Sequence, residues 1–221
     1  MGITPRFMNT IFHESREITR KQMAELIDAA TYAWRSDKPL SRSLTFNLKG
    51  LGGRRPQRFI STFTKLAGDW LATQDIERVY LWVLEWPPGQ SLNCHLLVHV
   101  PAEVMAGFAK KERSWLRQAG LKWKPNVLLS QKIGIRRGKK DRKLTIGEYL
   151  THLENALGYM LKGGNPKACN RLVIDHRFQG IIEGKRVGVA EAIGRKARTA
   201  SGYTPPSSMR FALVFSHRHK L

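Results

Sequence analysis

YLWVLE at residues 80–85 and NCHLLVHVP at residues 93–101 are two apolar runs of strand length. The segment between them, Pro87–Pro88–Gly89–Gln90–Ser91, has the composition of a hairpin connection. We therefore expect an antiparallel β-hairpin over residues 80–86 and 92–100. We expect this hairpin to carry candidate metal ligands on one of its faces.

The remaining elements follow from periodicity and end signals. Thr19 and Gln22 fit a capping box, and apolar residues follow them at helical spacing. An order of helices and strands around one hairpin predicts an α+β fold, a central antiparallel sheet flanked by helices. Periodicity predicts helices over 19–35, 59–70, 102–118, 145–161 and 189–199, and strands over 44–48, 171–174 and 211–215.

The length of 221 residues suits one sizeable domain or a domain with a tail. We divide it into an N-terminal helical segment (1–40), a core (41–180) and a basic C-terminal extension (181–221). The extension is less patterned than the core, and we expect it to belong to the same domain.

The charge is strongly basic, with 38 Lys and Arg against 17 Asp and Glu and a net charge of +21. Such an excess predicts a polyanionic partner, with nucleic acid first and an acidic membrane surface second. No apolar run approaches the ~18 residues of a spanning helix, and the N-terminus lacks a signal-peptide core. Two isolated cysteines, Cys94 and Cys169, are typical of a reduced compartment rather than of a disulfide framework. We expect a cytoplasmic protein without membrane contact.

A basic segment at residues 136–143 is the first candidate for phosphate contact, and a solvated loop is the alternative. Its candidate DNA-binding residues are Arg136, Arg137, Lys139, Lys140, Arg142 and Lys143.

One face of the hairpin carries candidate metal ligands. Alternate strand residues share a face, which places Asn93 with His95, and the neighbouring strand can bring Glu85 beside them. A carboxylate, an imidazole and an amide oxygen suit Mg²⁺ or Mn²⁺ better than zinc. His99 lies ~13 Å further along an extended strand, too far to share the ion. We expect His99 to be an ordinary half-buried residue at the strand end, and His95 would be one too without Glu85 on the neighbouring strand.

A second candidate group lies on the predicted helix over 145–161. At ~100° per residue, Glu148, His152, Asn155, Tyr159 and Lys162 fall within about an 80° sector. An ordinary polar helix face is one interpretation. The other is a tyrosine nucleophile: a free tyrosine has a pKa near ~10, and an ammonium one turn away, Lys162, could stabilise the developing charge.

Three segments resemble the HUH superfamily of single-strand endonucleases, and above all the replication initiators of bacterial plasmids and phages. Thr45–Phe46–Asn47 resembles the first core strand, Asn93–Pro101 the His–hydrophobic–His metal strand, and Tyr159–Met160–Leu161–Lys162 the Tyr–x–x–Lys helix. Gly184–Lys185–Arg186 and Ile193–Gly194 are weakly similar to a downstream segment. The resemblance implies a ferredoxin-like or RNA-recognition-like sheet with the tyrosine helix near the metal strand. Asn93 replaces the first histidine, which implies a weaker metal site.

The resemblance implies a site-specific nickase of single-stranded or hairpin DNA at a replication origin, with catalytic Tyr159 and Lys162 and a metal site of His95, Asn93 and Glu85. It would initiate rolling-circle replication through a 5′-phosphotyrosine link and leave a 3′-hydroxyl as primer. The resemblance also leaves open a host helicase or polymerase as a further partner. Three alternatives remain: a relaxase or transposase, a non-cleaving DNA-binding protein of the same fold, and a generic RNA-binding or ribosome-associated protein.

Overall fold

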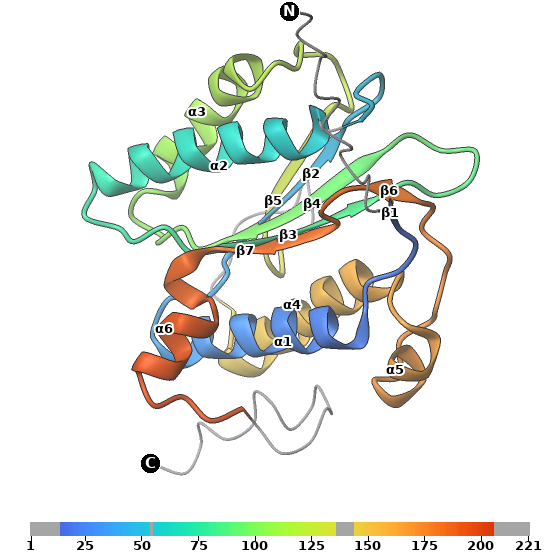
Figure 1. The fold of residues 1–221 in the computed structure, drawn as a ribbon. Helices are drawn as coiled ribbons and strands as arrows, with labels where there is room; N and C mark the ends of the chain where they lie inside the picture. The colour runs from blue at the N-terminus through green and yellow to red at the C-terminus, as the bar shows by residue number, and fades with distance from the viewer. Residues whose placement is uncertain (1–13, 54, 136–143, 206–221) are drawn as a thin grey trace, which may run out of the picture.

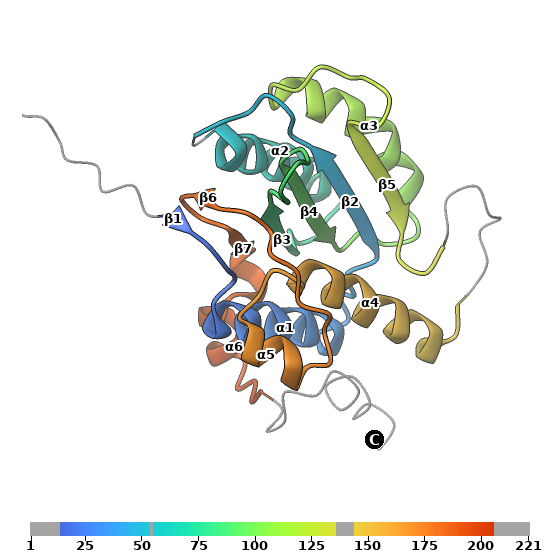
Figure 2. The same ribbon diagram turned by 90° about the vertical axis from the view of Figure 1, so that its right-hand side faces the viewer.

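The computed structural model describes residues 14–53, 55–135 and 144–205. Figure 1 shows a sheet with helices on both faces, and Figure 2 shows the same layers from the side. The expected α+β class is confirmed, with five antiparallel strands in the order β5-β2-β4-β3-β7. In chain order these strands are β2 (Arg42–Asn47), β3 (Tyr80–Glu85), β4 (Asn93–Val98), β5 (Leu128–Lys132) and β7 (Val187–Val189).

The predicted hairpin lies at the centre of this sheet. Strand β4 pairs with β3 on one side and with β2 on the other. The register places Glu85 opposite Asn93, and His95 opposite both Val83 and Thr45. Because side chains alternate along a strand, Thr45, Glu85, Asn93 and His95 all belong to the same face of the sheet.

Two apolar cores cover the two faces of the sheet. Helices α2 (Arg55–Ala72) and α3 (Met105–Gln118) pack on one face, around contacting aromatic rings such as Phe63 and Trp115. Helices α1 (Arg20–Arg35) and α4 (Ile146–Leu161) pack on the other. The second face is the one that carries the candidate metal ligands.

Both helices on that face begin at a capping box, as the sequence indicates for α1. The Thr19 side chain accepts a hydrogen bond from the backbone N–H of Gln22, and the Gln22 side chain accepts one from Thr19. Thr145 and Glu148 make the same pair at α4. These reciprocal bonds satisfy two otherwise unpaired N–H groups and fix where each helix starts.

The end of α4 is tied to the start of α1. The Ile18 N–H donates to the Gly163 carbonyl, and the Asn165 N–H donates to the Ile18 carbonyl. A Cβ on Gly164 would lie 2.9 Å from the Leu161 carbonyl oxygen and 2.4 Å from Met23 Sδ, and because the carbonyl belongs to the backbone, this close approach favours glycine. Because Tyr159 and Lys162 lie just before this junction, it fixes their position over the sheet.

Two predicted elements at the C-terminal side are wrong. Residues 171–174 are not a strand: the short helix α5 (Pro166–Arg171), capped by Asn165, ends there, and Val173 has φ 56°. The helix predicted over 189–199 is broken into β7, a 3₁₀ turn at Glu191–Ile193 and α6 (Arg195–Ala200). The strand predicted at 211–215 lies outside the described residues.

Two strands outside the main sheet, β1 (Glu14–Ser15) and β6 (Ile182–Glu183), form a short antiparallel ribbon. Strand β7, from the segment expected as an extension, is an edge strand of the main sheet. In the part of the chain that the structure describes, no helix has the length and apolarity needed to cross a membrane.

Candidate active site

The sheet supplies a buried carboxylate and imidazole from neighbouring strands. Glu85 Oε1 of β3 lies 2.7 Å from His95 Nε2 of β4. On the other side of the ring, Thr45 Oγ1 of β2 lies 3.0 Å from His95 Nδ1. The imidazole is thus held between two strands and presents Nε2 toward Glu85. Thr45 is a site residue that the sequence did not single out as one.

Helix α4 adds a tyrosine and a lysine to the same place. Lys162 Nζ lies 2.9 Å from Glu85 Oε2 and 3.3 Å from the centroid of the Tyr159 ring. The Tyr159 and His95 rings meet edge to face, with centroids 5.2 Å apart. The hairpin residues and the helix residues, derived separately from the sequence, therefore form one contiguous group.

The group has a buried interior and one accessible member. The side chains of Glu85, His95 and Lys162 are about nine-tenths buried or more, whereas Tyr159 is 54% exposed. Burial by itself would raise the pKa of Glu85, but the neighbouring His95 and Lys162 outweigh burial and lower it. Glu85 is therefore a carboxylate at neutral pH, and an incoming chain reaches Tyr159 first.

The carboxylate of Glu85 and the imidazole of His95 are ligand types that suit a divalent cation such as Mg²⁺ or Mn²⁺, and we expect them to bind it weakly. His95 Nε2 lies 2.7 Å from Glu85 Oε1, and Lys162 Nζ lies 2.9 Å from Glu85 Oε2, so a cation at Glu85 would compete with both neighbours. His95 Nε2 can act as a ligand in the tautomer whose proton is on Nδ1, beside Thr45 Oγ1. Mg²⁺ is commonly bound by one or two carboxylates with the rest of its shell from water and substrate phosphate. No group of three His, Cys, Asp or Glu side chains is arranged to hold a metal within the described ranges.

Asn93 is the third ligand that the sequence predicts. It pairs with Glu85 in the register and shares the face of His95. Its amide nitrogen donates to the Ser91 carbonyl at 3.0 Å, which leaves the amide oxygen as the group able to face a cation. The Lys162 ammonium, however, already neutralises part of the charge of Glu85, and this weakens the attraction of Glu85 for a cation.

The remaining members of the predicted helix stripe do not reach the sheet ligands. Glu148 is used in the helix cap, and His152 packs against Gly134, where a Cβ would lie 2.8 Å from the ring. Asn155 lies beside Tyr159 in a hollow of about 430 Å³. That hollow is also lined by Glu154, Gly158, Lys162, Leu172, Val173, Ile174, Asp175 and Arg177.

His99 lies at the other end of β4, as the spacing predicts. Its Nδ1 is 2.7 Å from the Pro39 carbonyl, and burial lowers its pKa. It packs the strand end and is not part of the site. The basic segment, Arg136 to Lys143, lies outside the described residues.

Replacing Thr45 with valine tests whether His95 must be held by this bond. Valine keeps the size of threonine but removes the hydroxyl at Nδ1. Loss of such a partner weakens metal binding or activity by about 10- to 100-fold in other metal sites. We expect a loss of that size in Mn²⁺ binding measured by calorimetry. Ser43→Ala, on the same face of β2, is the control, and equal effects of both variants would contradict the role of Thr45.

Comparison with known protein-family models, curated proteins and solved structures finds no match for this chain. Its function is therefore inferred from the residues of the site and from their geometry. Two features are the most informative about that function: the basic net charge, and the cluster in which Tyr159 contacts His95 and Lys162.

Proposed function

We propose that the protein is a divalent-metal-dependent endonuclease that nicks single-stranded DNA with Tyr159 as nucleophile, and that the nick initiates rolling-circle replication. One observation carries the proposal: an exposed tyrosine lies directly against a buried imidazole and a buried ammonium, and both of these contact the same buried carboxylate. The net charge of +21 supplies the attraction for a nucleic-acid strand. The HUH-like motifs described above support the same chemistry.

In the proposed reaction, Tyr159 Oη attacks a backbone phosphorus. A Tyr–O–P bond forms, and the bond from phosphorus to the 3′ oxygen breaks. The departing 3′ oxygen takes up a proton and becomes a free 3′-hydroxyl, while the 5′ phosphate stays on the tyrosine. The link keeps the energy of the phosphodiester, so a later 3′-hydroxyl can reverse the step and rejoin the strand.

The chain's own residues prepare Tyr159 for this step. A tyrosine is almost fully protonated at neutral pH, so its proton must leave as the bond forms. The Lys162 ammonium over the ring favours the negative charge that then develops. The His95 ring packs edge to face against the Tyr159 ring and helps to hold it in place.

Mg²⁺ or Mn²⁺ held by Glu85, His95 and the Asn93 amide oxygen would polarise the scissile phosphate. The carboxylate form of Glu85 and the Nε2 atom of His95, in the tautomer whose proton is on Nδ1, are the groups suited to hold it.

Asn93→His is expected to keep or raise the metal-dependent nicking rate. An imidazole is a stronger ligand than an amide for Mn²⁺, and position 93 lies opposite Glu85 on the ligand face. The measurement is the nicking rate against Mn²⁺ concentration, with half-saturation expected at lower Mn²⁺. A collapse of the rate in a folded variant would show that position 93 is not a ligand.

A non-cleaving DNA-binding protein of the same fold is the second candidate. The observation that favours it is the metal site itself: its third candidate donor is an amide oxygen, and the Lys162 ammonium already pairs with Glu85. Relaxase or transposase strand transfer would use the same tyrosine chemistry as the first proposal.

The test is cleavage of matched single-stranded DNA, single-stranded RNA and duplex DNA with Mn²⁺ or with EDTA. Metal-dependent cleavage confined to single-stranded DNA is the expected result. Tight, salt-sensitive binding of DNA without cleavage would support the second candidate. Equal binding of RNA and DNA without cleavage would indicate a general nucleic-acid-binding protein.

A further inference from the structure

A second hollow lies at the same end of the central hairpin as the candidate site. It measures about 620 Å³, within the range of ~300–1,000 Å³ usual for small-molecule sites. Trp86 directly follows Glu85, and Leu92 directly precedes Asn93, so this hollow adjoins the strand ends that carry two of the candidate metal ligands. Leu92 belongs to the core on the opposite face of the sheet from Tyr159.

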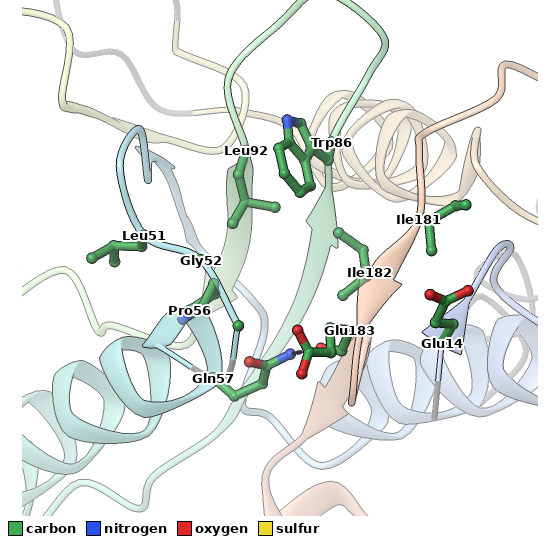
Figure 3. A pocket seen from close by; sticks show the side chains of 11 residues that line it. Glu14, Leu51, Gly52, Pro56, Gln57, Trp86, Leu92, Ile181, Ile182 and Glu183 are labelled. Atoms are coloured by element: carbon green, nitrogen blue, oxygen red, sulfur yellow. Dashed lines mark hydrogen bonds between the residues drawn. The ribbon is translucent and has the colours of Figure 1, made fainter. Parts of the chain in front are cut away.

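The walls of this hollow are apolar and partly aromatic. Figure 3 shows Trp86 and Leu92 facing Ile182 across the space, with Ile181 at its edge. Trp86 is 50% exposed and Ile181 is 41% exposed, although both are large apolar side chains. The Trp86 ring is oriented by its own N–H, which donates to the Gln90 carbonyl at 3.2 Å. An oriented, half-exposed indole is a surface on which a planar ring can stack.

Two carboxylates complete the hollow. Glu14 and Glu183 are directly opposite each other in the β1–β6 ribbon, and both line the space. Neither has an ion-pair partner among the residues described, although the chain has 38 Lys and Arg. Like charges in directly opposed positions cost stability. Carboxylate oxygens repel a phosphate but accept hydrogen bonds from the N–H groups of a nucleobase.

A neighbouring hollow has the opposite character. It shares Gly52 and Gly53 with the first and is otherwise lined by Arg55 and Arg58. Both arginines are exposed, and neither makes an ion pair in the described parts of the chain. A space for a planar apolar ring thus adjoins a cationic space of the kind that binds a phosphate.

The wall opposite Trp86 is held rigidly. The buried Arg186 guanidinium donates to the carbonyls of Ser15, Gln179 and Gly180. The Gln57 side chain donates to the Glu183 carbonyl at 2.7 Å. A hollow formed in advance binds a ring without the entropic cost of ordering its own walls.

We infer that this hollow binds an unstacked nucleobase bearing N–H donors, guanine above all, from the strand whose phosphate reaches Tyr159. Guanine fits best because its ring N–H and amino group lie on one edge, where two carboxylate oxygens can accept both. The inference rests on the proposed function for its ligand, and it adds a site of base selection on the opposite face of the sheet.

The test is single-strand binding measured in EDTA, so that cleavage is not required. Fluorescent oligonucleotides carry one abasic site, moved along the strand, and each is bound by wild type, Trp86→Ala and Trp86→Phe. We expect one position at which the abasic site weakens wild-type binding by about tenfold, the effect of losing one stacked base. For Trp86→Ala, the abasic site at that position should not weaken binding any further. For Trp86→Phe, it should weaken binding almost as much as it does for wild type.

Trp123→Ala is the matched control, because Trp123 is another exposed tryptophan, 39% accessible, and does not line this hollow. Glu183→Gln should reduce the preference for guanine over inosine, which lacks the amino group, at the same position. The inference would be overturned if no abasic position weakened binding by wild type. It would also be overturned if Trp86→Ala showed the same loss at the same position as wild type.

The nicking assay on the same oligonucleotides separates this result from the proposed function. Nicking by wild type with a flat abasic profile would overturn the base pocket alone. If one abasic position weakens binding in a way that depends on Trp86, but no oligonucleotide is nicked, the result would support the base pocket and count against the endonuclease.

Discussion

Replacement of Tyr159 with phenylalanine is expected to abolish nicking while binding of single-stranded DNA stays within a few-fold of wild type. The variant loses only the attacking oxygen, since the ring that contacts Lys162 and His95 remains. Loss of a covalent nucleophile typically lowers the rate by roughly 10⁴-fold or more. The rate is measured on an end-labelled oligonucleotide with Mn²⁺, and binding is measured on the same strand in EDTA.

Tyr149→Phe is the control on the same helix. Its hydroxyl donates to the Leu40 carbonyl at 2.9 Å and does not line the hollow beside Tyr159. Loss of that bond costs about 1 kcal/mol of stability and should leave nicking unchanged. Full activity of Tyr159→Phe would contradict the assignment and direct attention to Tyr203, the partly exposed tyrosine beside Tyr32.

Replacement of Glu85 with glutamine should have the second-largest effect, on both activity and stability. The change removes the carboxylate that contacts His95 and the Lys162 ammonium. Breaking one side of a buried pair typically costs about 3–5 kcal/mol, because the other charge stays buried without a partner. We expect nicking to fall by at least ~100-fold, as for loss of a metal ligand, and unfolding by urea to begin at a lower concentration.

The double variant Glu85→Gln/Lys162→Met separates the two effects. Removal of the ammonium should restore much of the stability lost by Glu85→Gln, because no buried charge is left unpaired. Activity should stay low, since the carboxylate is still missing. Recovery of nicking in the double variant would contradict a catalytic role for both residues.

Acid should remove the stability advantage that Glu85 gives. The folded-state pKa of Glu85 is lowered from 4.5, so the carboxylate contributes stability above that value and loses it as pH falls through the lower, folded-state pKa. The difference between wild type and Glu85→Gln in the free energy of unfolding should therefore be full at neutral pH and shrink below about 4.5. A difference that does not change with pH would show that the charge is not the cause.

The central hairpin and the main helices could be predicted because their signals are local. Two strands buried on both faces are continuous apolar runs, and a capping box marks the start of α1. Strands β5 and β7 were missed because both are edge strands: β5 reads Leu-Leu-Ser-Gln-Lys, and β7 has only three residues around a glycine. Their pairing depends on neighbours distant in the sequence, which periodicity cannot show.

The site was predictable to the extent that it follows from alternation and helical spacing. Alternation places Asn93 and His95 on one face, and spacing places Tyr159 and Lys162 on one stripe. The ion pair between Lys162 and Glu85 depends on how α4 packs on the sheet, which the sequence does not give. Thr45 could have been found, because alternation along β2 places it on the ligand face beside His95.

The most direct test of the nucleophile uses two labels on one cleavable single strand. The protein is incubated with Mn²⁺ and an oligonucleotide labelled at either its 5′ or its 3′ end, and the products are separated under denaturing conditions. A Tyr159 attack that forms a 5′-phosphotyrosine predicts that the 3′ label stays on the protein and the 5′ label leaves on a shorter strand. Peptide mapping by mass spectrometry should place the adduct on Tyr159. Cleavage without any adduct, or with the 5′ label on the protein, would contradict the account.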